Sequence, residues 1–336
     1  MKNKETIRKL RDCAKGLLEV ARELQSSERM EPPRTLEIVE RQIRAKDGKA
    51  HAFCLPFVVG VDEFRDDVVL ELARLPHVLI GGATGQGKTM CLYSLIAGLV
   101  ATKTPDEVRL VVYDPKCVEY TGLADLPHLI MPPVTSVEKM VEAVHWIESE
   151  VDKRLQMFAS VKCRNISQFN SREQEDEDAK ALPKTVPYII AVLDDISDLM
   201  RNAGKEIEPT LCRITAIARA AGVHLVMTTA RPDAKTVTSA IKANVPGRIA
   251  FMTASDTDSK LLIEDGGAED LLGTGDFLLR EGFGEIVRGQ GAFITDDEIN
   301  TLVDSTTKKF GKMTGGLRSK TTPSQEPPRS RGTKSD

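Results

Sequence analysis

Aromatic residues are scarce, because only 4% of the 336 residues are Phe, Tyr or Trp. Proteins that bind single-stranded nucleic acid through OB-fold or RRM domains stack bases on aromatic side chains, so such a surface is poorly supplied here. The formal net charge of −4 argues against a uniformly basic coat for nucleic acid. A basic groove or pore stays compatible with this charge, because the local field depends on where the charges lie.

Paired cysteines and long apolar runs are also missing. The six cysteines are scattered, without a CxxC pair or a histidine at zinc spacing, which indicates reduced thiols of the kind found in the cytosol. The best apolar run, Ser94 to Ala101, is far shorter than the roughly 20 residues that span a membrane. The charged N-terminus lacks the apolar stretch of a secretion signal. We therefore expect a cytoplasmic protein without membrane insertion.

The first 53 residues are expected to form an N-terminal helical adaptor segment. Apolar residues recur at helical spacing over residues 5–30, namely Ile7, Leu10, Leu17, Val20 and Leu24. Pro32 and Pro33 then break the pattern. Such a helix either packs on its own domain or pairs with a partner or the next subunit.

Residues 54–304 have the sequence pattern of an α/β domain. Short β-rich runs are predicted as strands at Phe57 to Val61, His77 to Ile80, Arg109 to Tyr113, Tyr188 to Leu193 and Val223 to Thr228. Helices are predicted between them at Met90 to Ala101, Val137 to Phe158 and Glu206 to Ala221. Strands that alternate with helices predict a mostly parallel sheet covered on both faces.

The C-terminal segment from Ser305 has a different composition. It carries eight Lys or Arg residues against two acids, together with Ser, Thr, Pro and Gly. Such a segment cannot bury enough apolar surface to fold alone. We expect a disordered basic tail over residues 305–336.

A phosphate-binding loop is the strongest motif. The apolar run His77 to Ile80 leads into Gly82, Ala83, Thr84, Gly85, Gln86, Gly87, Lys88 and Thr89, which match GxxxxGK[ST] at every fixed position. The glycines let backbone N–H groups close around phosphate oxygens. Lys88 is expected to reach the β- and γ-phosphates of ATP, and the Thr89 hydroxyl is expected to ligate Mg²⁺.

A second apolar run, Tyr188 to Leu193, ends in two acids. We expect Asp194 to be associated with Mg²⁺ and Asp195 to orient the attacking water, since a P-loop enzyme needs carboxylates at this position. Asp114, Pro115 and Lys116 end another strand on the same edge of the sheet, where ligands bind in open α/β folds, although a plain turn fits them equally well.

Taken together, these motifs resemble the motor domain of the FtsK/SpoIIIE family over roughly residues 55–299. Asp114 to Lys116 with Glu119 resemble that family's "DPK..EL", and Asp194 to Met200 resemble "DE.ADLM". The other motifs, which stand with these in the family's order, are Leu75 to Thr89, Pro127 to Leu129, Pro133 to Thr135, Arg164 to Ile166, Phe169 to Asn170, Arg219 to Leu225, Arg231 to Pro232, Ile241 to Pro246, Arg248 to Phe251, Asp258 to Ser259, Gly267 to Glu269, Leu271 to Gly273 and Gly275 to Asp276.

The resemblance implies a RecA-like P-loop NTPase core of the HerA/FtsK branch. It further implies a hexameric ring with ATP sites at subunit interfaces, double-stranded DNA in the pore, and an arginine finger supplied in trans. The residue that matches the finger is Arg219, and Arg248 is the second candidate.

Four departures from the family pattern affect these expectations. Asp195 stands where the family usually has Glu, Ala230 replaces the Gln of "TQRP", and Lys260 replaces the Arg of "DSR". The first two changes bear on the rate of turnover. We recognise neither a membrane-spanning region nor a C-terminal winged-helix reader, so we expect neither septal anchoring nor sequence-directed orientation.

The sequence thus predicts an ATP-dependent translocase of double-stranded DNA that moves, segregates, transfers or packages its substrate. One alternative is an FtsK-like protein-secretion ATPase, whose substrate is a peptide signal. The other is an ATP-binding scaffold with little turnover, which the changes at Asp195 and Ala230 favour.

Overall fold

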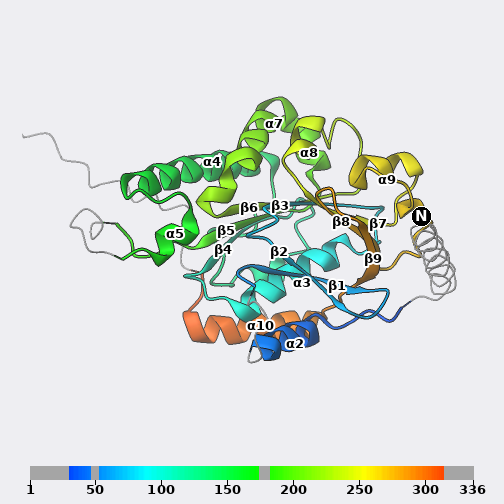
Figure 1. Ribbon diagram of the computed structural model, residues 1–336, viewed down its shortest axis with the longest axis horizontal. Helices are drawn as coiled ribbons and strands as arrows, with labels where there is room; N and C mark the ends of the chain where they lie inside the picture. The colour runs from blue at the N-terminus through cyan, green and yellow to red at the C-terminus, as the bar shows by residue number, and fades with distance from the viewer. Residues whose placement is uncertain (1–29, 47–52, 174–181, 314–336) are drawn as a thin grey trace, which may run out of the picture.

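A nine-stranded sheet forms the centre of the molecule, with helices on both faces (Figure 1). The computed structural model describes residues 30–46, 53–173 and 182–313. The predicted helix over residues 5–30 lies outside this part, apart from its last residue, and so do residues 314–336 of the expected tail. The strands lie in the order β2-β1-β9-β8-β7-β3-β6-β5-β4. Their bounds are β1 (Pro56–Asp62), β2 (Asp67–Glu71), β3 (His77–Gly81), β4 (Val108–Tyr113), β5 (Tyr188–Leu193), β6 (Val223–Thr229), β7 (Gly247–Phe251), β8 (Asp276–Glu281) and β9 (Ile286–Gly291).

One half of the sheet is parallel and the other half is antiparallel. Strands β7, β3, β6, β5 and β4 pair in parallel. Strands β8, β9, β1 and β2 extend the sheet in antiparallel pairing from the edge of β7. All five predicted strands are present, whereas β2, β7, β8 and β9 were not predicted as strands.

The helices form a layer on each face of the sheet (Figure 1). One layer contains α4 (Val137–Ser160), α7 (Ile196–Ala221), α8 (Ser239–Ala243) and α9 (Asp256–Ile263). The other contains α2 (Thr35–Lys46), α3 (Lys88–Thr102) and α10 (Asp296–Phe310). Shorter pieces are η1 (Thr121–Leu123), α5 (Ile166–Ser171) and η2 (Ala268–Asp270).

Strand β5 shows why the central strands have nearly continuous apolar sequences. Its residues Ile189, Ala191 and Leu193 belong to the core beneath α4 and α7. Its residues Ile190 and Val192 belong to the core on the side of α3. A strand that is covered on both faces buries every side chain, so alternation with polar residues is lost. Among the residues described, no helix is both long enough and apolar enough to cross a membrane.

Both expected boundaries of the α/β domain need correction. The buried Ile38 and Val39 of α2 pack with Val58 and Val61 of β1, so residues 35–46 belong to the domain and not to a separate adaptor. At the other end α10 continues to Phe310, past the expected boundary at Asp304. The acids in its first turn and the Lys pair in its last turn match the helix dipole, so Lys308 and Lys309, two of the eight basic residues assigned to the tail, end a helix instead.

Two buried histidines on neighbouring strands, His77 and His224, should make the fold sensitive to acid. Burial, together with the neighbouring ring of His224, lowers the pKa of His77 from 6.5 to about 3. Burial lowers the pKa of His224 from 6.5 to about 4. Both rings therefore stay neutral in the folded protein but protonate near pH 6.5 once unfolded. Their stabilising contribution is complete above pH 6.5 and is lost as the pH falls toward 4.

The free energy of unfolding, measured by urea titration between pH 7.5 and 4.5, should fall less steeply in His224→Gln than in wild type. The exposed His145→Gln is the control, and an equal slope in all three proteins would contradict this account.

Candidate functional site

The predicted phosphate loop connects β3 to α3 at the carboxyl ends of the parallel strands. Gly82, Gly85 and Gly87 have positive φ angles of 146°, 80° and 121°, which side chains rarely adopt. At Gly82 a Cβ atom would lie 2.8 Å from the Cβ of Phe251, so the loop also needs glycine for close packing. The backbone therefore curls as the motif requires.

Neighbouring segments fix the shape of this loop. The Ala83 amide donates to the Met252 carbonyl at 2.8 Å. On the other side, the Gly275 amide donates to the Gln86 carbonyl at 3.0 Å, and the Thr274 amide donates to Gln86 Oε1 at 3.2 Å. The loop is thus held from both sides.

The first turn of α3 presents positive partial charge toward the loop. Gly87 caps this helix without a side-chain hydrogen bond, and the first turn contains no acid. The free N–H groups can therefore bind phosphate. Lys88 and Thr89 lie in this turn. Lys88 Nζ donates to the carbonyls of Gly82 at 2.7 Å and Ala83 at 2.9 Å. Burial lowers the pKa of Lys88, and the negative charges of Asp195 and Asp194 oppose that shift.

The predicted acidic pair follows β5 directly, on the same edge of the sheet as the phosphate loop. Strand β6 lies between β3 and β5 and contributes Thr228. The Thr228 hydroxyl donates to Asp194 Oδ1 at 2.7 Å and accepts the Asp195 amide at 2.8 Å. Burial raises the pKa of Asp194, while its hydrogen bond with Thr228 and the charge of Lys116 act in the opposite direction. A bound cation would offset the same burial cost.

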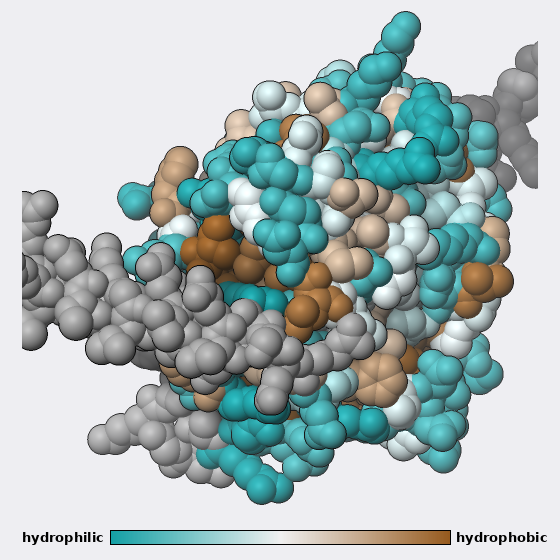
Figure 2. Space-filling view, turned by 90° about the vertical axis from the view of Figure 1, so that its right-hand side faces the viewer, coloured by the Kyte–Doolittle hydropathy of each residue, from teal (hydrophilic) through white to brown (hydrophobic). Residues whose placement is uncertain are grey.

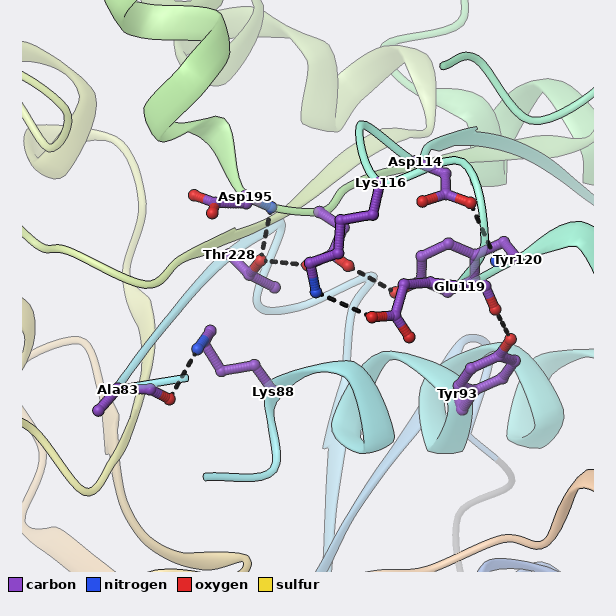
Figure 3. A network of polar contacts seen from close by, with 10 residues as sticks. Ala83, Lys88, Tyr93, Asp114, Lys116, Glu119, Tyr120, Asp195 and Thr228 are labelled. Carbon is purple, nitrogen blue, oxygen red and sulfur yellow. Dashed lines mark hydrogen bonds and ion pairs between the residues drawn. The ribbon is translucent and has the colours of Figure 1, made fainter. Parts of the chain in front are cut away.

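Asp195 has a left-handed backbone conformation and caps the start of α7. Its φ of 52° and ψ of 78° are left-handed, a conformation that Asp tolerates better than most residues. Its Oδ1 accepts the Ser197 amide at 3.2 Å and so caps α7. This helix begins ten residues earlier than the sequence predicted. Figure 3 shows Asp195 on the same side of the site as Lys88, with its carboxylate turned away from Thr228.

The segment from Asp114 to Tyr120 lies against the acidic pair. The buried Tyr120 hydroxyl donates to Asp194 Oδ2 at 3.3 Å, and its amide donates to Asp114 Oδ2 at 3.1 Å. The Lys116 ammonium pairs with Glu119 at 2.9 Å and extends toward the centre of the site (Figure 3). The pKa of Lys116 is raised because the hydrogen bond with Glu119 and the charge of Asp194 outweigh burial.

Tyr120 and Tyr93 connect this segment to the phosphate-loop helix, and both were missed from the sequence. Their rings lie 5.2 Å apart, and the Tyr93 hydroxyl on α3 donates to the Glu119 carbonyl. Tyr120 stands where the family motif "DPK..EL" has Leu, and this difference was the available signal. Burial, followed by the charge of Asp194, raises the pKa of Tyr120 well above 10, so its hydroxyl stays a donor to Asp194.

Tyr120→Phe should lower kcat for ATP hydrolysis about five- to tenfold, because a hydrogen bond to a charged carboxylate is lost while the ring stays. The KM for ATP should change little, since Tyr120 contacts Asp194 and not the phosphate loop. Steady-state kinetics would measure both constants. Tyr188→Phe, at the opposite end of β5, is the matched control, and equal kcat values for the two variants would remove the assigned role of Tyr120.

Ala230 lies in a cavity of about 430 Å³ beside the phosphate loop. Gly82, Ala83 and Thr84 line the same cavity, together with Arg231. The Gln that the family has in place of Ala230 would therefore sit next to the phosphates. Lys260, the third departure, pairs on the surface with Asp256 at 2.7 Å.

The two candidate arginines lie in different surroundings. Arg219 is exposed in the last turn of α7, about 36 Å along the helix from Asp195. It lies near the amino ends of the strands, so it cannot serve the site of its own subunit. Arg248 is only 11% exposed and pairs with Glu264 at 2.7 Å. Its guanidinium also donates to the carbonyls of Lys242, Val245 and Leu262. This engagement disfavours Arg248 as an arginine finger.

The residues present fit a magnesium ion that is shared with a nucleotide. Among the described residues, no group of three or more His, Cys, Asp or Glu side chains could hold a metal by itself. Mg²⁺ usually takes only one or two protein ligands and completes its shell with phosphate oxygens and waters. Each oxygen of Asp194 keeps a lone pair beyond its one hydrogen bond, and Thr89, the other expected ligand, lies in the first turn of α3.

Comparison with known proteins agrees with this geometry. The FtsK/SpoIIIE family model matches residues 38–234. The chain is 40% identical over 260 residues to the DNA translocase FtsK of Borreliella burgdorferi, covering 77% of this chain and 32% of that protein. It is 37% identical over 279 residues to the Haemophilus influenzae DNA translocase FtsK, covering 77% of this chain and 52% of that protein. The chain thus spans about a third to a half of these two curated relatives.

Solved structures show the same fold. The pCW3 conjugation coupling protein TcpA, in its monomer form with ATPγS, superposes with a TM-score of 0.64 at 25% identity over 75% of this chain and 70% of that chain. The cytoplasmic domain of the Thermomonospora curvata type VII secretion ATPase EccC superposes with a TM-score of 0.66 at 20% identity over 77% of this chain and 32% of that chain. The second likeness concerns the fold alone.

Proposed function

Because this chain belongs to the FtsK/SpoIIIE family, we propose that it is an ATP-driven motor that moves double-stranded DNA. The observation that supports this most is the assembly of Lys88, Asp194 and Asp195 on one edge of the sheet. Relatives named DNA translocase FtsK supply the choice of DNA as substrate. The work would take place in the cytoplasm, where such DNA lies.

The chemistry assigned to each residue follows from its place. Thr89 and Asp194 would hold Mg²⁺, which would supply positive charge to the phosphate groups of ATP. Lys88 exchanges its two carbonyl partners for the β- and γ-phosphates. Asp195 orients the attacking water with the oxygen that does not cap α7.

A ring, most simply a homo-hexamer, would complete the site. The charge that develops on the γ-phosphate needs a cation, and the exposed Arg219 can reach only a neighbour's nucleotide. Subunit contacts near Arg219 would therefore place ATP between subunits.

An ATPase assay with and without duplex DNA tests the proposed function, with Lys88→Ala as the baseline. We expect hydrolysis above the baseline that duplex DNA of any sequence stimulates. Stimulation by a protein partner and not by DNA would favour the secretion ATPase. ATP binding without turnover under any condition would favour the scaffold.

Asp195→Asn should lower hydrolysis by about two orders of magnitude while ATP binding survives, because the base is lost and the contacts to the nucleotide remain. Asn also caps helices and tolerates the left-handed conformation, so α7 should keep its start. The half-buried Asp198→Asn, in the first turn of the same helix, is the control. Wild-type turnover in Asp195→Asn would move the catalytic role to Asp198 or to another element.

A further inference from the structure

A pocket of about 520 Å³ lies beside the last turn of α7, at the amino ends of β5 and β6. Two arginines with exposed side chains line it, Arg219 on α7 and Arg164 just ahead of α5. None of the described residues that line it is Asp or Glu. His224, which also lines it, stays neutral because burial lowers its pKa to about 4. The pocket therefore carries two positive charges and suits an anion.

Arg164 begins a family motif to which no function has been assigned so far, and local structure accounts for its other polar residues. Asn165 caps α5 by accepting the Gln168 amide at 2.9 Å. Asn170 exchanges two hydrogen bonds of 2.9 Å with the backbone of Val186. Arg164 donates only through its amide, to Gln168 at 2.8 Å, and its guanidinium has no partner among the residues that the structure describes. Local folding thus gives no reason for an arginine here.

The backbone positions that carry the two arginines are firmly connected. The buried Ile166 packs on Gly222, the left-handed residue that ends α7, where a Cβ atom would lie 2.3 Å from its Cδ1. The Gly222 amide donates to the Arg219 carbonyl at 3.1 Å. The buried Arg154 of α4 donates to the Ala221 carbonyl at 3.1 Å. The two guanidiniums are therefore presented together without a ligand, which lowers the entropy that binding costs.

The anion has to come from outside this chain. Tyr188, in the pocket, begins β5, and Leu193 ends that strand next to the acidic pair. Five steps along a strand cover roughly 17 Å, so the nucleotide of the same chain lies at the opposite end of the sheet. A guanidinium binds phosphate oxygens through parallel hydrogen bonds, and adjacent phosphates carry enough negative charge for two guanidiniums.

A neighbouring subunit also offers carboxylates, which are the alternative anions. Figure 1 shows α5 and α9 on opposite sides of the molecule. On the side of α9, apolar side chains gather within a largely hydrophilic surface (Figure 2), and a groove near them is lined by Asp62, Glu63, Asp270 and Glu285. These acids stand along an apolar groove, whereas a triphosphate concentrates its charge on adjacent groups. Two arginines in one pocket therefore favour the triphosphate.

We propose that Arg164 and Arg219 together bind phosphate oxygens of the ATP held by the neighbouring subunit. The proposal rests on the ring proposed above and adds Arg164 as a second residue supplied in trans. Two guanidiniums stabilise the charge that develops on the transferred phosphoryl group better than one.

Arg164→Ala should lower the kcat of assembled rings by about 10- to 100-fold, the effect of losing a hydrogen bond to a charged group. Thermal unfolding should not change, because this guanidinium has no partner among the described residues of its own chain. Arg164→Lys keeps the charge without the planar fork and should recover only part of the rate. Lys162→Gln removes an exposed cation two residues away and, as the matched control, should keep the wild-type kcat.

Mixing experiments test whether Arg164 acts from the same side of the interface as Arg219. A mixture of Arg164→Ala with Lys88→Ala should exceed the mean of the two separate rates, because some interfaces combine an intact Lys88 with both arginines. A mixture of Arg164→Ala with Arg219→Ala should not exceed that mean, because every interface then lacks one arginine. A rise in the second mixture would place Arg164 in the site of its own subunit and overturn the proposal.

Ring assembly gives a measurement that does not depend on turnover. By light scattering, Arg164→Ala should need about tenfold more protein than wild type for half-maximal assembly with ATPγS, and an equal amount without nucleotide. An equal defect in both conditions would assign Arg164 to carboxylates of the neighbour and overturn the proposal. A normal kcat in Arg164→Ala would remove Arg164 alone, whereas full activity of Arg219→Ala would remove the arrangement in trans on which this inference rests.

Discussion

Replacing Lys88 with alanine should reduce ATP turnover by a factor on the order of 1,000 while the fold persists. The Lys88 ammonium lies between the phosphate loop and the acidic pair, where its pKa reflects both burial and the charges of Asp195 and Asp194. Charge that develops on the transferred phosphoryl group would lose its main stabilising cation in this chain. The alanine variant leaves the Gly82 and Ala83 carbonyls without that donor but removes no apolar contact of the central sheet.

Two measurements distinguish a catalytic loss from unfolding in Lys88→Ala. Thermal unfolding should stay close to that of wild type, and the exposed Lys153→Ala should keep normal kcat and KM. A Lys88→Ala protein that hydrolyses ATP at the wild-type rate would remove the phosphate loop from the mechanism.

Much of the site could be predicted because its central residues are contiguous in sequence. The residues from Gly82 to Thr89 are consecutive, and Asp194 and Asp195 directly follow one buried strand. The local sequence pattern was therefore enough to predict where both motifs lie in the fold. Parallel strands bring their carboxyl ends to one edge, which made it possible to expect that the two motifs meet.

The contacts that orient Asp194 could not be predicted in this way. Tyr120 lies 74 residues from Asp194 and Thr228 lies 34 residues away, so their hydrogen bonds depend on strand order. That order puts β6 between β3 and β5, and no local pattern specifies it.

The four strands β2, β7, β8 and β9 were missed for a different reason. β7 contains residues of a family motif, Arg248 to Phe251, but was not predicted as a strand. β8 and β9 flank a turn with Gly282 and Gly284, which was a usable hairpin signal. Similarly, Ser197 and Asp198 after Asp195 were the signal for a helix start that the prediction placed ten residues too late.

Mixing two inactive variants should restore activity if Arg219 serves a neighbouring subunit. Arg219→Ala should by itself lower turnover by at least about 1,000-fold, the effect of an arginine finger. In a one-to-one mixture with Lys88→Ala, about a quarter of the interfaces in a closed ring combine an intact Lys88 with an intact Arg219. The ATPase rate of the mixture should therefore rise far above that of either variant alone. The rise needs shared rings, so it should disappear at protein concentrations too low for assembly, as measured by light scattering.

Arg213→Ala, which removes an exposed arginine from the same helix, is the control for a general effect on α7. Full activity of Arg219→Ala alone, or no recovery in rings that contain both variants, would mean that the catalytic cation comes from elsewhere, with the exposed Arg231 beside the phosphate loop as the next candidate.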